Sequence, residues 1–108
     1  MSLQSEMLDN KTVVTLPDEL TIYTVGEIKE ALTPLIYQGR ELELNLANIA
    51  EIDSAGLQLL IAAKKSAQQQ GYPLSLVWHS NVVLELLELC QLSGFFGDPT
   101  LITHDERP

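Results

Sequence analysis

Apolar residues recur along this chain with two different periods, and the changes of period divide it into segments. Residues 3–8 and 11–16 are short strand-like runs separated by Asp9 and Asn10, which tolerate turn conformations, so the chain is expected to open with a hairpin. Leucines alternate strictly with polar residues over 41–46, a period of two that is typical of a strand with one buried face. Two further runs predict a buried strand over 74–78 and a short edge strand over 100–104.

The first segment with helical spacing runs from Val25 to Ile36. Its apolar residues lie three and four positions apart, Thr24 can cap its start and Gly39 can end it. Pro34 lies inside this run. Because a proline removes a helix hydrogen bond at a cost of about 3 kcal/mol, a kink or two short helical pieces are expected there.

Two more helices follow. One covers 54–70 and is stopped by Gly71, and the last covers 82–92 after a cap at Ser80 or Asn81. The resulting order is strand, strand, helix, strand, helix, strand, helix, with the edge strand after it. Such alternation predicts an α/β fold with a small mixed sheet of four or five strands, whose later strands are parallel and joined by right-handed crossovers.

Charge and composition narrow the range of partners. Fifteen acidic residues against six basic ones give a formal net charge of −9, which repels phosphate backbones and anionic lipids, so nucleic-acid binding is not expected. The apolar runs are shorter than the ~20 residues of a membrane-spanning helix, and the start of the chain does not resemble a secretory signal. We therefore expect one soluble cytoplasmic domain without membrane insertion. The single Cys90 lies in an apolar pattern and is expected to be buried and reduced.

The stretch DSAGLQLL, residues 53–60, contains the strongest candidate site. If Ser54 caps the helix, its hydroxyl accepts a hydrogen bond from the amide of Gly56 or Leu57, which contributes about 1 kcal/mol and needs no further function. However, residues 55–63 have Gln58 as their only polar side chain. This apolar collar is either buried on all sides or is in part a patch that a partner covers.

Two further features favour a binding role for the start of this helix. Ala55 and Gly56 keep the first turn low, so a partner or an anion can approach its amides closely. A phosphate on Ser54 would be stabilised by the positive end of the helix dipole, yet it would add nearly two negative charges beside Asp53 and the apolar residues. Ser54 is therefore a candidate for a reversible switch that turns binding off.

Catalysis is not expected from this sequence. A nucleophilic serine requires a base, and the only histidines, His79 and His104, stand in no recognisable triad context. Two histidines and one cysteine at wide spacing match no metal-ligand pattern, and no phosphate-binding P-loop is present. We expect neither a metal nor a cofactor.

The chain resembles the STAS domain, the sulfate transporter and anti-sigma factor antagonist family. The resemblance is carried by LELNLANI, IDSAGLQLL, GYPLSLV and VLELLELCQLSGFF, and it extends from about Thr12 to Phe96. It implies a small mixed sheet with helices packed mainly on one side. It also implies one STAS-like domain over residues 1–108, with a core at about 3–97 and a short polar C-terminal tail.

In bacterial anti-sigma factor antagonists, the serine of this motif is phosphorylated by a partner kinase that is itself the anti-sigma factor. The unphosphorylated domain binds that kinase and frees the sigma factor. Carried over by position, the resemblance implies that Ser54 is the phosphorylation site. The residues expected to bind the partner are Asp53, Ser54, Ala55, Gly56, Leu57, Gln58 and Ile61.

One departure from the family pattern leaves an alternative open. Many members have a Leu-Asp pair in the loop after the second strand, near the kinase-docking surface. This chain reads Leu20-Thr21-Ile22 there and lacks the aspartate. STAS domains also serve as accessory subunits of lipid-transporting ATP-binding cassette systems, where a transporter ATPase is the partner, and occur alongside chemosensory proteins. A constitutive binding scaffold of either kind is the alternative. We expect a monomer, or a weak dimer formed through an exposed apolar collar.

Overall fold

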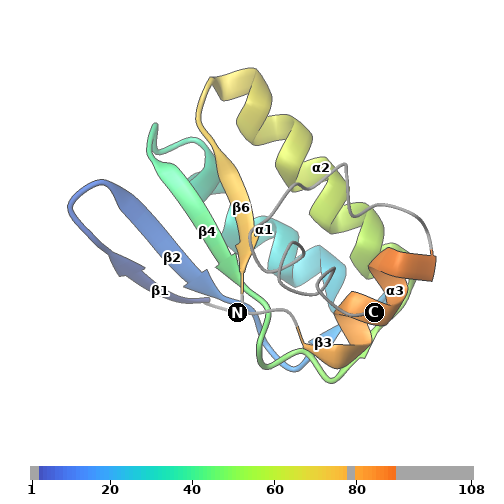
Figure 1. Cartoon of the computed structure of the whole chain (residues 1–108). Coiled ribbons are helices and arrows are strands. Elements are labelled where there is room, and N and C mark those ends of the chain that lie inside the picture. Colours follow the sequence, from blue (N-terminus) through green and yellow to red (C-terminus); the bar gives the residue numbers. More distant parts are fainter. Residues whose placement is uncertain (1–2, 78–79, 90–108) are drawn as a thin grey trace.

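A computed structural model describes residues 3–77 and 80–89 and shows a mixed sheet covered by helices (Figure 1). The main sheet consists of β1 (Gln4–Met7), β2 (Lys11–Thr15), β4 (Glu41–Asn45) and β6 (Leu74–Val77), in the order β1-β2-β4-β6. β1 and β2 form the expected antiparallel hairpin, while β2, β4 and β6 are parallel. The predicted α/β class and mixed sheet are confirmed.

Alternation along the strands determines which face of the sheet is buried. In β2 and β4 every second residue is buried, and Val14 and Leu44 lie directly opposite each other in the register. Helices α1 (Val25–Ile36) and α2 (Ser54–Gln70) lie side by side and pack on one side of the sheet (Figure 1). The third helix, α3 (Asn81–Leu89), contacts β5 (Glu51–Ile52). Buried leucines, isoleucines and valines from all these layers form one core.

The observed helix ends agree in part with those predicted from the sequence. α2 ends where predicted, with Gly71 at a φ of +82° as its left-handed C-cap. The expected division of the first helix is wrong, because α1 runs as one helix with Pro34 in its last turn. Thr24 occupies the N-cap position of α1, but its hydroxyl donates to the carbonyl oxygen of Glu19 at 3.0 Å instead of accepting from a helix amide.

A second, two-stranded parallel sheet was not predicted from the sequence. It pairs β3 (Glu19–Leu20) with β5, with Glu19 opposite Glu51 and Leu20 opposite Ile52. The carbonyl oxygen of Asp18 accepts hydrogen bonds from the amides of Ala50 and Glu51 at 2.8 and 3.1 Å. Each strand has only two residues, too few to show a period. This small sheet brings the loop after β3 to the start of α2.

Several expectations concern parts of the chain outside the described residues. These are the edge strand over 100–104, the surroundings of Cys90, His79 and His104, and the polar tail. Within 3–77 and 80–89, no helix is long and apolar enough to cross a membrane.

Candidate functional site

The N-terminus of α2 is capped by Asp53 and not by Ser54. Asp53 has an extended backbone, and its Oδ1 accepts a hydrogen bond from the amide of Gly56 at 3.0 Å. Ser54 is the first residue of the helix. The expectation that the Ser54 hydroxyl caps the helix is therefore wrong by one position, and the aspartate performs that role.

The second carboxylate oxygen of Asp53 links the helix to the loop after β3. Its Oδ2 accepts from the amide of Ile22 at 3.0 Å, across 31 residues of sequence. The hydrogen bonds from the amides of Ile22 and Gly56 hold the pKa of the Asp53 carboxyl below its ordinary value, because they stabilise the charged form. Asp53 is thus an ionised bridge between the loop and the helix.

Because Asp53 provides the cap, the hydroxyl of Ser54 is left for other interactions. The Ser54 side chain is exposed and makes no hydrogen bond to any residue in the described part of the chain. It lies in the first turn of a 17-residue helix, where the dipole favours negative charge. The cap of α2 therefore does not depend on the Ser54 hydroxyl.

The other residues expected to bind a partner are divided between surface and core. Gln58 is exposed, and Ser54, Gln58 and Ile61 recur at a spacing of three or four, so they lie along one stripe of α2. Ala55 and Ile61 are half-buried. Leu57 is only 5% exposed and belongs to the core, so the expectation that it contacts a partner is corrected.

Gly56 is buried as well, and the low first turn is occupied by the protein itself. A Cβ at this position would lie 2.1 Å from the carbonyl oxygen of Leu20. The backbone of β3 therefore fills the space that was expected to admit a partner or an anion. Gly56 is needed for the close packing of β3 on α2, and not for direct contact with a ligand.

Most of the apolar collar also lies in the core. Leu59, Leu60 and Ala63 are buried, and of residues 55–63 only Gln58 and Ala62 are exposed. Of the two predicted alternatives, burial is therefore the correct one for most of this segment. The physical reason is that α2 has the sheet on one flank and α1 on another.

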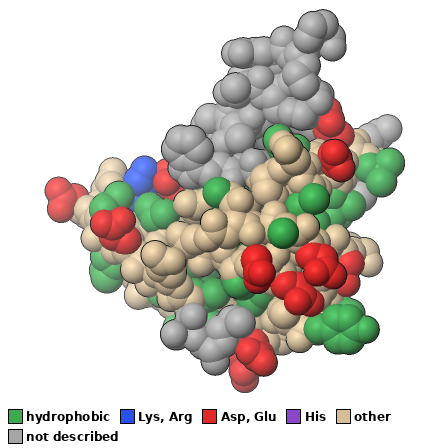
Figure 2. All heavy atoms as spheres, turned by 90° about the horizontal axis from the view of Figure 1, so that it is seen from below, with side chains coloured by type: hydrophobic (Ala, Val, Ile, Leu, Met, Phe, Trp, Pro, Cys, Tyr) green, Lys and Arg blue, Asp and Glu red, His purple; other side chains and the backbone are tan. Residues whose placement is uncertain are grey.

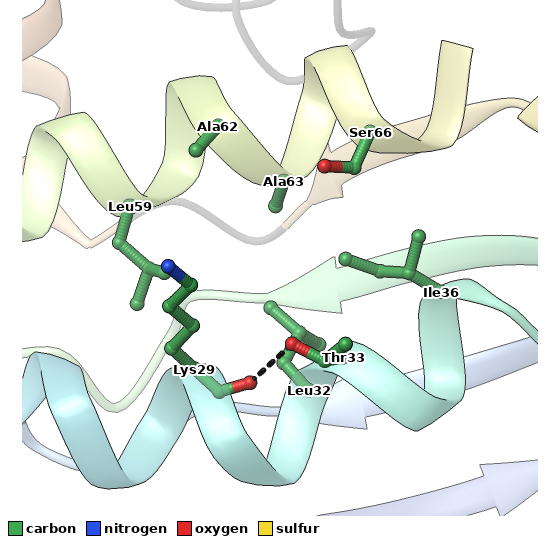
Figure 3. A pocket seen from close by; sticks show the side chains of 8 residues that line it. All are labelled: Lys29, Leu32, Thr33, Ile36, Leu59, Ala62, Ala63 and Ser66. Atoms are coloured by element: carbon green, nitrogen blue, oxygen red, sulfur yellow. Dashed lines mark hydrogen bonds between the residues drawn. The ribbon is translucent and has the colours of Figure 1, made fainter. Parts of the chain in front are cut away.

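A shallow groove of about 250 Å³ separates the first turns of α1 and α2. Two of its lining residues, Ala55 and Gln58, lie close to Ser54 in α2 and were expected to bind a partner. The lining residues from α1 were not indicated by the sequence. Farther along the same two helices is a smaller apolar pocket of about 40 Å³, toward which Lys29 extends from α1 (Figure 3). The groove is lined by Val25, Gly26, Lys29, Ala55, Gln58, Leu59 and Ala62.

The loop between β3 and α1 displays two large apolar side chains. Ile22 is 63% exposed and Tyr23 is 87% exposed. We call this pair the Ile22–Tyr23 knuckle. The family resemblance already pointed to this loop through Leu20-Thr21-Ile22, but the sequence analysis did not single out the exposed pair, whose residues fall between a strand and a helix and belong to the apolar period of neither.

Negative charge predominates around the site. Viewed from the end of the molecule at which β3 lies, acidic side chains gather in several clusters, whereas basic ones are few (Figure 2). Among the described residues, no group of three or more His, Cys, Asp and Glu side chains is placed to hold a metal ion.

Comparison with known proteins identifies the family. The family model described as "Mlab, STAS domain" matches residues 3–103. The chain belongs to the STAS domain family. The anti-sigma-B factor antagonist of Staphylococcus aureus is 31% identical to this STAS domain over 93 residues, which are 85% of this chain and 86% of the relative.

Solved structures show the same fold. The STAS domain protein from Planctomyces limnophilus superposes with a TM-score of 0.78 at 17% identity, covering 89% of this chain and 87% of that one. The unphosphorylated form of the anti-sigma factor antagonist SpoIIAA gives a TM-score of 0.69 at 22% identity, covering 84% and 82% of the two chains. The resemblance stated from the sequence is confirmed.

Proposed function

We propose that this STAS domain is a regulatory binding module that associates with a kinase of the anti-sigma factor type and is released when Ser54 is phosphorylated. The observation that carries this proposal is the position of the helix cap. Asp53 accepts from the amide of Gly56, so the cap does not need the exposed Ser54 hydroxyl, which forms no hydrogen bond within residues 3–77 and 80–89. A phosphate can be added there without loss of the cap.

The choice of partner is supported by the relatives. The Staphylococcus aureus protein is an anti-sigma-B factor antagonist by name, and its similarity covers most of both chains. A protein partner also suits the exposed stripe of α2 and the groove beside it, which are too open to enclose a small substrate. The partner-binding residues that we retain are Ser54, Ala55, Gln58 and Ile61, with Asp53 holding the site together.

Electrostatics explain why the phosphate would release the partner. A kinase that modifies Ser54 must hold the terminal phosphate of ATP against its hydroxyl. Once phosphorylated, Ser54 would carry nearly two negative charges facing the nucleotide phosphates, and like charges repel at such short distances. The same group would also place a strongly hydrated anion beside the half-buried Ala55, where an apolar contact would otherwise form.

We propose no catalytic role for Ser54. The nearest acidic neighbour in sequence, Asp53, accepts two amide hydrogens, which lower its pKa. A carboxylate with a lowered pKa is a poor general base. The serine is therefore a substrate of another protein's chemistry.

Affinity capture from the native cell tests this function. The baits are the wild type, Ser54→Ala, Ser54→Glu and a charge-matched control, Ser5→Glu, which adds the same charge to an exposed serine of edge strand β1. We expect a kinase held by the wild type, Ser54→Ala and Ser5→Glu but lost from Ser54→Glu, with phosphate on Ser54 detected by mass spectrometry. Full retention of the kinase by Ser54→Glu would contradict the proposal.

A second candidate is a constitutive accessory subunit of a lipid-transporting ATP-binding cassette system. It is favoured by Thr21, which stands in the loop where many family members have an aspartate. Thr21 is only 4% exposed, and its hydroxyl donates to the carboxylate of Glu19 at 2.6 Å. In that case all four baits would hold a transporter ATPase equally, and Ser54 would carry no phosphate.

A further inference from the structure

We propose that this domain has a second binding surface, at the end of the molecule remote from Ser54, which takes an acidic and partly apolar segment of another protein. Two exposed tyrosines and three cations form it, in the C-terminal parts of α1 and α2 and just after them. We call it the distal surface and define it by Tyr37, Arg40, Lys64, Lys65 and Tyr72. The proposal does not rest on the proposed function, because none of these residues belongs to the Ser54 site.

The C-terminal ends of α1 and α2 lie together at one end of the molecule. Each helix is followed by a strand, and these two strands, β4 and β6, are parallel and begin side by side, with Leu42 opposite Leu74 (Figure 1). Ser54 begins α2, a helix of 17 residues that is therefore about 25 Å long. A partner bound at the distal surface thus leaves Ser54 accessible.

Large apolar side chains are exposed at this end. Within residues 3–77 and 80–89, four of them gather here, two from the ends of the helices and two from the turn between β1 and β2. The four are Met7, Leu8, Tyr37 and Tyr72. Exposed apolar side chains that gather in one place mark interaction sites, and tyrosine is enriched among the residues that dominate interface energetics.

The backbone that carries the two tyrosines is fixed by hydrogen bonds. The amide of Tyr72 donates to the carbonyl oxygen of Ala67 at 3.2 Å, and the amide of Tyr37 donates to that of Thr33 at 3.2 Å. The ring of Tyr72 lies against Gly39, where a Cβ would be 3.4 Å from the tyrosine hydroxyl oxygen. Such a surface is preorganised, so a partner does not have to order it on binding.

The charge of the distal surface is opposite to that of the rest of the molecule. In a chain with fifteen acidic residues, the segments 31–40 and 54–77 contain no Asp or Glu, but they contain Arg40, Lys64 and Lys65. Arg40 donates to the carbonyl oxygens of Leu8 and Lys11, and Lys64 Nζ donates to that of Leu74 at 3.0 Å, so hydrogen bonds to neutral oxygens hold both cations at this end. Partial negative charge at the ends of the two helices, about half a unit each, offsets only part of these three charges.

The carboxylates nearest to the distal surface do not cancel its charge. Leu42 faces the core, so the alternation along β4 directs Glu41 and Glu43 to the side of the sheet away from the helices. Glu43 forms an ion pair with Lys11 there, at 2.8 Å. Asp9 remains at the rim, in the exposed turn between β1 and β2.

Complementarity to this surface defines the partner. Cations beside two tyrosines favour a segment that combines carboxylates with aromatic or aliphatic side chains. The other described parts of the chain contain Lys29 as their only Lys or Arg, and they repel such a segment. An acidic protein segment is therefore steered to the distal surface.

A random library of 16-residue peptides, displayed on phage and selected against the purified protein, tests the proposal. We expect the selected peptides to be enriched in Asp and Glu next to aromatic or aliphatic residues, and their binding to weaken as salt is raised. Failure to select any peptide, or selection of peptides without acidic residues, would overturn the proposal.

Variants with matched controls locate the binding of a selected peptide. Tyr72→Ala and Lys65→Glu should each weaken it by at least about tenfold, whereas Tyr23→Ala and Lys29→Glu, the same changes elsewhere, should alter it less than about threefold. Lys65 is exposed, so Lys65→Glu tests the surface even if Tyr72→Ala does not fold. Equal losses in the controls would place the peptide elsewhere and reject the distal surface.

The remaining outcomes distinguish other occupants and the proposed function. Tighter binding of the protein to phosphatidylglycerol vesicles than to the peptides, lost in Lys65→Glu, would replace the acidic segment by a lipid surface and overturn the proposal. Self-association lost in Lys65→Glu would assign the surface to the acidic end of a second copy, with the same consequence. Ser54→Glu should bind the peptides as the wild type does, so loss of the kinase switch leaves this result unchanged.

Discussion

At the scale of single residues, one position of offset at the start of α2 decides what Ser54 is able to do. Asp and Ser are both favoured helix caps, so the sequence alone did not distinguish Asp53 from Ser54. Asp53 has two acceptor oxygens, and the loop after β3 provides a second donor, the amide of Ile22. The hydrogen bond from Ile22 that favours Asp53 over Ser54 as the cap spans 31 residues of sequence, so no local sequence pattern predicts it.

The Asp53 bridge predicts a dependence of stability on pH. Its pKa is lower in the folded protein than its ordinary value of 3.8, so its contribution is fully present at neutral pH. The contribution is lost as the pH falls below about 3.8 and through the folded pKa. Asp53→Asn should therefore have a lower Tm than the wild type at pH 7, and the gap should narrow toward pH 3.

Thermal unfolding of both proteins between pH 7 and pH 3 measures this effect. A gap in Tm that is independent of pH would show that the charge of Asp53 does not stabilise the fold. Hydrogen exchange gives a second readout, because the amide of Ile22 should exchange faster in Asp53→Asn.

Gly56 provides a prediction with a matched control in the other helix. Gly56→Ala should destabilise the protein by about 3 kcal/mol, because the new Cβ would meet the backbone oxygen of Leu20 at 2.1 Å. Gly26→Ala, in the first turn of α1, meets nothing within 4 Å and should be neutral or stabilising by up to about 1 kcal/mol. Urea unfolding compares the two, and equal stabilities would contradict the close packing of β3 on α2.

At the scale of elements, regular periods were predictable and irregular contacts were not. The alternation over 41–46 predicted β4, and the glycine at 71 predicted the end of α2. The two-residue strands β3 and β5 were missed because their pairing is determined by contacts about 30 residues apart. The exposed stripe of α2 was therefore predictable, whereas the knuckle that the small sheet places beside it was not.

Arg40, just before β4, connects the start of β2 with the turn between β1 and β2. Its guanidinium donates to Thr12 Oγ1 at 3.2 Å, to the carbonyl oxygen of Lys11 at 2.9 Å and to that of Leu8. Arg40→Met should cost about 1–3 kcal/mol, because these acceptors lose a charged donor.

The control for Arg40 removes a neighbouring cation. Lys11 forms an ion pair with Glu43 at 2.8 Å, but its side chain is partly exposed, and such pairs contribute little. Lys11→Met should therefore leave the urea midpoint nearly unchanged. A larger loss of stability in Lys11→Met than in Arg40→Met would show that the ion pair, and not Arg40, stabilises this part of the sheet.

At the scale of the whole molecule, charge and burial together bear on self-association. The weak dimer was expected only if the apolar collar were exposed, and most of the collar is buried. A net charge of −9 adds repulsion between copies. We therefore predict a monomer in sedimentation experiments at low salt. A sedimentation coefficient that rises with concentration would contradict this, and Tyr23→Ala would then test whether the knuckle mediates the contact.

The short β3–β5 sheet forms only in the folded protein, so any partner that binds both the loop after β3 and the start of α2 requires a folded domain. Ile22 and Ser54 are 32 positions apart in the sequence and share one surface only after Leu20 pairs with Ile52. A linear peptide containing Ser54 lacks this composite surface, and a nascent or damaged copy lacks it too. A partner that requires both would ignore such copies, and the β3–β5 pairing would then restrict binding to folded molecules.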